Sequence, residues 1–87
     1  MEKKDNNSML FIQLINQNQH VALMSMGKIE NPVSKKSEKN IEYAKFAIDT
    51  LDMLHVKTKG NLNEYEEKYI QETINELKLM YVEAFKK

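Results

Sequence analysis

The sequence predicts an all-α fold of three helices, in which helices two and three form an antiparallel hairpin and helix one packs on it. Three stretches carry apolar residues at the 3.6-residue period of a helix. A residue suited to N-capping precedes each stretch, and a short connection containing glycine joins the last two. No stretch alternates apolar and polar residues at the two-residue period of a strand. The 87 residues are enough for one small domain, which we expect to span residues 8–87.

The first helix is predicted over Ser8–Met26, after a charged and amide-rich stretch, residues 1–7, that we expect to be a disordered tail. Gly27 supplies the stop signal. The main apolar arc of this helix consists of Leu10, Phe11, Leu14, Ile15, Val21, Ala22 and Met26. Ile12 and Leu23 are predicted to project from the opposite side, and no residue of the helix carries a formal charge. Because an outward-facing helix surface normally carries charges, we expect a second copy of the chain to cover part of it.

The second helix is predicted over Asn40–Lys57, with Asn40 as its N-cap, after a flexible loop over residues 28–39 that contains the single proline. Its principal apolar stripe consists of Tyr43, Ala44, Ala47, Ile48, Leu51 and Leu54. Phe46 and Met53 form a thinner second stripe. A helix with two apolar stripes is expected to have two neighbours.

The connection between helices two and three carries the most specific local signals. It consists of Lys57, Thr58, Lys59, Gly60, Asn61 and Leu62. Gly60 can take the left-handed conformation that ends a helix, and the two lysines complement the negative end of the helix dipole. The threonine and the asparagine are expected to satisfy backbone groups at the helix end. Asn63 and Glu66 then form an Asn-x-x-Glu capping box, which begins a third helix predicted over Asn63–Phe85.

The third helix places most of its apolar residues on one broad face. This face consists of Tyr69, Ile70, Thr73, Ile74, Leu77, Met80, Tyr81, Ala84 and Phe85. Leu79 and Val82 fall outside this face and are predicted to be exposed. The sequence thus predicts a hairpin whose two helices share one apolar seam.

Composition disfavours several classes of function. The 13 acidic and 13 basic residues cancel, and none of the basic residues is the arginine that usually makes phosphate and base-edge contacts. We therefore expect no nucleic-acid partner. With no cysteine the chain can form no disulfide or thiolate metal site, and its first residues show no signal-peptide pattern. The lack of cysteine and of a signal-peptide pattern leads us to expect a cytoplasmic protein. Amides crowd the middle of helix one, which disfavours a membrane span.

The residues best suited to catalysis or metal binding are Asp49, Asp52 and His55, which recur at every third position of helix two. An Asp-x-x-His pair on a helix can ligate a metal, but the chain offers one such motif where di-metal bundles use two. We therefore interpret these side chains as a solvent-facing surface; Asp49 alternatively is a partly buried carboxylate that accepts hydrogen bonds from the hinge or the first helix. Neither they nor His20 has the partner that a nucleophile–base pair requires. We expect no catalytic residue, no cofactor and no metal site.

Several short motifs follow one another along the chain. They are Leu23-Met24-Ser25-Met26-Gly27, Asn31-Pro32, Ile48-Asp49-Thr50-Leu51-Asp52-Met53-Leu54, Lys57-Thr58-Lys59-Gly60-Asn61-Leu62, Glu66-Glu67 and Leu77-Lys78-Leu79-Met80-Tyr81-Val82. On these motifs the chain resembles, from Phe11 to Val82, a bacterial family catalogued as domain of unknown function number eighteen forty-four. The resemblance implies a short all-helical bacterial protein and assigns no activity. His55-Val56 stands where members of that family more often carry charged or amide residues, which argues against a shared metal role.

The favoured hypothesis for function is a non-catalytic interaction or assembly module. We expect a homo-oligomer, most simply a dimer, with helix one at its centre. An unidentified protein is the other partner that this surface could bind. The first alternative is a metal-dependent or hydrolytic enzyme that uses Asp49, Asp52 and His55. The second alternative is a nucleic-acid-binding regulator.

Overall fold

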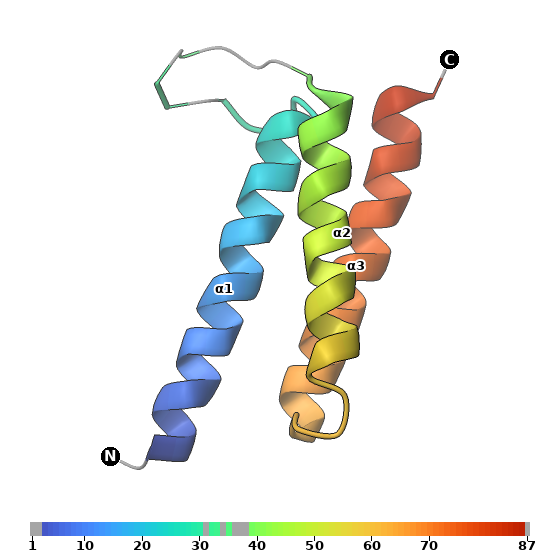
Figure 1. Cartoon of the computed structure of the whole chain (residues 1–87). Coiled ribbons are helices and arrows are strands. Elements are labelled where there is room, and N and C mark those ends of the chain that lie inside the picture. Colours follow the sequence, from blue (N-terminus) through green and yellow to red (C-terminus); the bar gives the residue numbers. More distant parts are fainter. Residues whose placement is uncertain (1–2, 31, 34, 36–38, 87) are drawn as a thin grey trace.

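The computed structural model describes residues 3–30, 32–33, 35 and 39–86, with side chains from Asn6 onwards. Three helices make up the fold: α1 (Lys3–Ser25), α2 (Ile41–Lys57) and α3 (Glu64–Phe85). They run up, down and up, so each helix is antiparallel to the one before it (Figure 1). Within the described residues the only β-type pairing is an isolated bridge between Met26 and Lys39. The prediction of an all-α, three-helix fold is confirmed.

Helix α1 is longer at its N-terminus than predicted. The helix begins at Lys3, so residues 3–7, which we expected to be disordered, are helical, and Ser8 lies inside the helix instead of capping it. None of these residues is Gly or Pro, and lysine is a good helix former, so the chain passes through the capping signal without a break. Residues 1–2 of the expected tail lie outside the described residues.

The C-terminal end of α1 forms as the sequence predicts. Gly27 has a positive φ of 76°, the N–H of Lys28 donates to the carbonyl of Leu23 at 2.9 Å, and the N–H of Gly27 donates to that of Met24 at 3.0 Å. This is a Schellman motif, in which a glycine in the left-handed region lets the chain leave the helix. After the connection the N–H of Asn40 donates to the carbonyl of Ser25 at 2.7 Å, which places the start of α2 beside the end of α1. Five residues of the predicted flexible loop, 31, 34 and 36–38, lie outside the described residues.

The hydrophobic core draws on all three helices. Its buried members are Ile15, Ala22, Met26, Ala44, Ala47, Ile48, Leu51, Ile70, Ile74 and Leu77. The two alanines of α2 leave room for its neighbours to approach closely, and the larger side chains of α1 and α3 fill the space between the helices. The predicted core stripe of α2 is confirmed except for Tyr43, which is exposed, and Leu79 and Val82 of α3 are exposed as predicted.

The side of α1 that faces the core differs from the prediction. Ile12 and Leu23, expected to project away from the main apolar arc, pack against the core, whereas three members of that arc are exposed. These are Leu10, Leu14 and Val21. The reason is that α1 has two neighbours: α2 lies along one side, and α3 lies along the side that carries Asn16, which accepts a hydrogen bond from the Tyr69 hydroxyl. Contact with α3 rotates the buried side of α1 away from the average direction of its apolar residues.

Candidate functional site

The hinge residues between α2 and α3 hold the two helices in a tight connection. The Thr58 hydroxyl donates to the carbonyl of Leu54 at 2.6 Å, so its predicted role at the helix end is confirmed. The N–H of Asn61 donates to the carbonyl of Thr58 at 2.8 Å and closes a turn in which Gly60 has a φ of 87°. A positive φ at this turn position favours glycine, because other residues are strained there. Every one of these contacts serves the backbone of the hinge itself.

The remaining members of the hinge signature divide between solvent and core. Lys57, Lys59 and the Asn61 side chain are exposed, whereas Leu62 packs against the core. Asn63 accepts a hydrogen bond from the N–H of Glu66 at 2.7 Å, and the Glu66 carboxylate accepts one from the N–H of Asn63 at 2.9 Å. The predicted capping box is confirmed, and it buries Glu66 with its hydrogen bond made.

The structure does not bring Asp49, Asp52 and His55 together as one site. Asp49 accepts a hydrogen bond from Lys45 on its own helix at 2.8 Å, and Asp52 pairs with Lys78 of α3 at 3.1 Å. The hydrogen bond that Lys45 donates to Asp49 raises the pKa of Lys45 above its ordinary value. Asp49 is exposed, so the interpretation of it as a partly buried acceptor for the hinge or for α1 is wrong. Among the described residues no three His, Cys, Asp or Glu side chains are grouped so that they could hold a metal ion.

His55 takes a partner that the sequence did not predict. Its Nε2 lies 2.7 Å from a carboxylate oxygen of Glu67, in the first turn of α3. The two side chains line a shallow cleft of about 270 Å³ with Val56 and Lys59. The sequence could have indicated this pair, because Glu67 follows closely after a tight hinge that places the start of α3 beside the end of α2. This pair ties the hinge end of the hairpin together.

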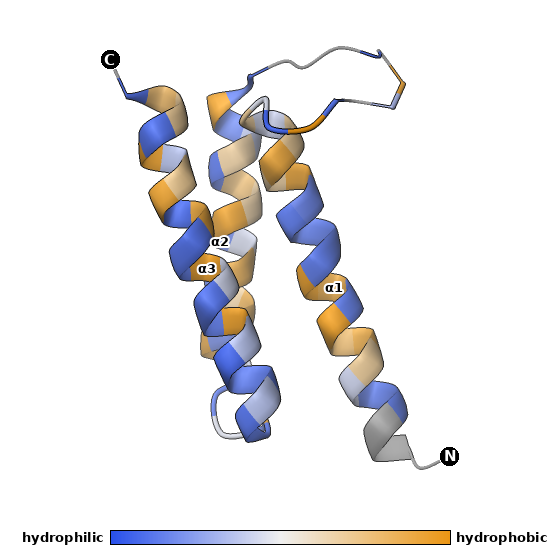
Figure 2. Cartoon of the chain, turned by 180° about the vertical axis from the view of Figure 1, so that it is seen from behind, coloured by the Kyte–Doolittle hydropathy of each residue, from blue (hydrophilic) through white to orange (hydrophobic). Residues whose placement is uncertain are grey.

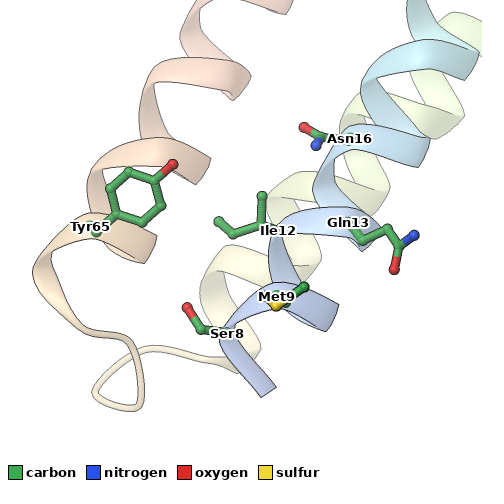
Figure 3. Close-up of a pocket in the computed structure, with 6 residues that line it drawn as sticks. All are labelled: Ser8, Met9, Ile12, Gln13, Asn16 and Tyr65. Atoms are coloured by element: carbon green, nitrogen blue, oxygen red, sulfur yellow. The ribbon is translucent and has the colours of Figure 1, made fainter. Parts of the chain in front are cut away.

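A second cleft lies where the N-terminal half of α1 leans away from α3. It measures about 430 Å³ and is lined by Ser8, Met9, Ile12, Gln13, Asn16 and Tyr65. Figure 3 shows Tyr65 of α3 across the cleft from Ile12 of α1, with Asn16 farther along α1. Tyr65 stacks on Tyr69 with ring centroids 6.0 Å apart. Among the described residues that line this cleft none carries a formal charge, and they offer apolar, amide and hydroxyl contacts.

A group of exposed apolar residues on α1 and α2 forms a surface of the described chain that no other helix covers. It consists of Leu10, Leu14 and Val21 of α1 with Tyr43, Phe46 and Met53 of α2, all exposed, and we refer to it as the α1–α2 face. At about 100° per residue, the α1 members lie away from Asn16, which marks the side toward α3. The α2 members likewise lie away from Asp52, which pairs with α3. Both sets are therefore on the side of the bundle opposite α3. The lower part of α2 lies in front of α3 in Figure 1, and α3 lies in front of α2 in Figure 2, which is seen from behind.

A family model described as Domain of unknown function (DUF1844) matches residues 8–83. The chain belongs to the DUF1844 family. The match confirms the resemblance that the sequence motifs indicated, and it includes most of each helix of the DUF1844 fold. No curated protein and no solved structure matches the chain.

The part of this DUF1844 chain that the structure describes contains no helix that is both long and apolar enough to cross a membrane. Figure 2 shows why α1 falls short, because hydrophilic residues form blue bands in its middle. These are the amides and the histidine between Asn16 and His20, none of which has a formal charge at neutral pH. From Ser8 to Ser25, the outer side of α1 is thus polar in part, apolar in part, and without formal charge.

Proposed function

We propose that this DUF1844 chain is a non-catalytic interaction and assembly module that acts in the cytoplasm and self-associates, most simply as a dimer, through α1. The observation that carries the proposal is the outer side of α1. Leu10, Leu14 and Val21 lie there, exposed, in a helix with no formal charge from Ser8 to Gly27. A helix that faces only water normally carries charges on its outer side, and a stripe of exposed apolar residues marks a contact surface.

The ionisable side chains of α2 support a non-catalytic role. Asp49, Asp52 and His55 each contact a different side chain, and each of those contacts serves a helix or the link between α2 and α3. Catalytic groups need to meet at one point beside a substrate. Asp49 lines a shallow cleft of about 280 Å³ between α2 and α3 with Lys45 and Lys78, and neither Asp52 nor His55 is among the residues that line it. A surface for another protein chain is the function that the exposed chemistry supports best.

Light scattering on the purified chain at micromolar concentration tests the proposal. We expect a mass of about 20.6 kDa, twice the 10.3 kDa of one chain. Leu14→Lys, which places a charge in the apolar stripe of α1, is expected to return the mass to that of one chain. Ile12→Lys or Leu23→Lys would be poor tests, because both residues pack against the core and their loss would unfold the chain.

Glu72→Lys on the exposed surface of α3 is the matched control and should remain dimeric. A wild-type mass of one chain over the whole accessible concentration range would contradict the proposal. Circular dichroism on each variant separates loss of assembly from loss of folding.

A further inference from the structure

We infer that two copies of the chain pack through the whole α1–α2 face, about a two-fold axis perpendicular to the helices, with Phe46 as the main anchor. This inference rests on the proposed self-association and adds α2, the symmetry and the register to it. Phe46 is 70% exposed although it is a large aromatic residue, and nothing in a single chain covers it. Buried aromatic anchors of this kind carry much of the free energy of protein–protein association.

The register of α1 against α2 shows how the two stripes are aligned. The Ser25–Asn40 hydrogen bond and the Met26–Lys39 bridge pair residues whose numbers add up to 65. Because α1 and α2 are antiparallel, residues of the two helices at the same height along the bundle keep this sum. The midpoint between Leu10 and Val21 is between residues 15 and 16 of α1. The midpoint between Phe46 and Met53 is between residues 49 and 50 of α2, which is the same level. With Tyr43 included, the α2 stripe runs from residue 43 to residue 53 and is centred at residue 48, so the centres of the two apolar stripes lie within about 2 Å of each other along the helices.

A two-fold axis that serves both stripes requires their centres to lie close together. An axis through that level, perpendicular to the helices, places each helix antiparallel to its own copy. Phe46 then lies against Met53 of the partner subunit, and Leu10 lies against Val21 of the partner subunit. Two stripes with centres far apart along the helices would not both face their own copies across one axis, so the close alignment favours a second copy over an unrelated partner.

Charge supports the same arrangement. In a two-fold contact, residues near the axis meet their own copies, so any charge there would face a like charge. The exposed apolar stripe of α1, from Leu10 to Val21, has no formal charge. Asp49, the charged residue of α2 at the level of the axis, is paired with Lys45 on its own helix. On α2 the exposed Glu42 and Lys57 lie near opposite ends of the stripe, and their midpoint is again between residues 49 and 50. The axis places Glu42 beside Lys57 of the partner subunit, which is a favourable pair.

The exposed apolar area is sufficient for such a contact. The six residues of the α1–α2 face range from 39% to 70% exposed. A fully exposed aromatic side chain presents about 150–250 Å², and with the aliphatic side chains taken at the lower end of that range the six residues present at most roughly 600 Å² per chain. Two copies would therefore bury at most roughly 1,200 Å² of apolar side-chain surface, the lower end of the range for stable protein–protein interfaces.

The main test compares two substitutions at equally exposed positions. Phe46→Lys places a charge in the α1–α2 face, whereas Leu79→Lys does the same on the outer side of α3, where the leucine is 72% exposed. Sedimentation equilibrium should show the dimer dissociation constant rising by roughly thirtyfold or more in Phe46→Lys. Leu79→Lys should change it by less than about twofold. Met53→Lys serves as the second variant if circular dichroism shows that Phe46→Lys has not folded.

A charge exchange tests the axis itself. Glu42→Lys is expected to weaken the dimer, because it faces Lys57 of the partner subunit, and the double variant Glu42→Lys with Lys57→Glu is expected to recover most of the loss. Recovery in the double variant supports the antiparallel arrangement of α2 with its copy. Failure to recover, with all variants folded, overturns that arrangement.

The outcomes separate this inference from the proposed function. If Leu14→Lys dissociates the dimer and neither Phe46→Lys nor Met53→Lys does, the contact is confined to α1, and the present inference is wrong while self-association stands. If the wild-type chain is a monomer, both are wrong.

Discussion

Replacement of Gly60 by valine isolates the energetic role of the hinge. Gly60 has a φ of 87°, and a Cβ built at this position would have no neighbour within 4 Å. The cost of Gly60→Val is therefore a backbone cost, because the side chain meets open space. A residue with a Cβ pays about 1–2 kcal/mol in the left-handed region. For a domain of this size each kcal/mol lowers the melting temperature by about 4–8 °C, so we expect a fall of about 5–15 °C.

Thermal unfolding followed by circular dichroism at one fixed chain concentration measures this effect, since self-association would make the melting temperature depend on concentration. Gly60→Asn is the control, because asparagine tolerates the left-handed region better than valine, and it should lose clearly less. Equal melting temperatures for wild type and Gly60→Val would refute the hinge geometry. Equal losses in the valine and asparagine variants would show that the cost does not arise from the backbone conformation.

Three further substitutions have defined expectations. Asn63→Ala removes the N-cap of α3 and should lower the free energy of unfolding by about 1 kcal/mol in chemical denaturation, whereas Asn63→Asp should retain most of it. Leu51→Ala, at a fully buried position of α2, should cost about 2–5 kcal/mol in the same assay, and a smaller loss would show that the core is looser than described. Asp49→Asn should leave the melting temperature unchanged within error, because its pair with Lys45 is exposed to solvent; a large shift would show that Asp49 has a structural role.

Local signals predicted most of the fold correctly. The caps at Asn40 and Asn63 and the glycines at 27 and 60 are read from a few neighbouring residues, and each of them forms as expected. Such signals depend on backbone hydrogen bonds within one turn, so they require no knowledge of the tertiary arrangement. They also predicted the antiparallel hairpin, because two helices joined by so short a connection pack antiparallel to each other.

The rotation of α1 could not be predicted in the same way. Its apolar residues are spread over much of its circumference, so an average direction does not identify which side is buried. The side that faces the core depends on where α2 and α3 lie together, and this is decided by contacts distant in sequence, such as Asn16 with Tyr69. The pairing of His55 with Glu67 was missed for the same reason.

Spin-label distance measurement at Gln17 tests the proposed self-association most directly. The chain has no native cysteine, so Gln17→Cys introduces a single labelling site, on the exposed side of α1 and close to the proposed axis. The account predicts strong dipolar coupling between the two labels of a dimer, at a much shorter distance than for Glu72→Cys on α3. Absence of coupling between chains at Gln17, in a folded sample at high micromolar concentration, would contradict it.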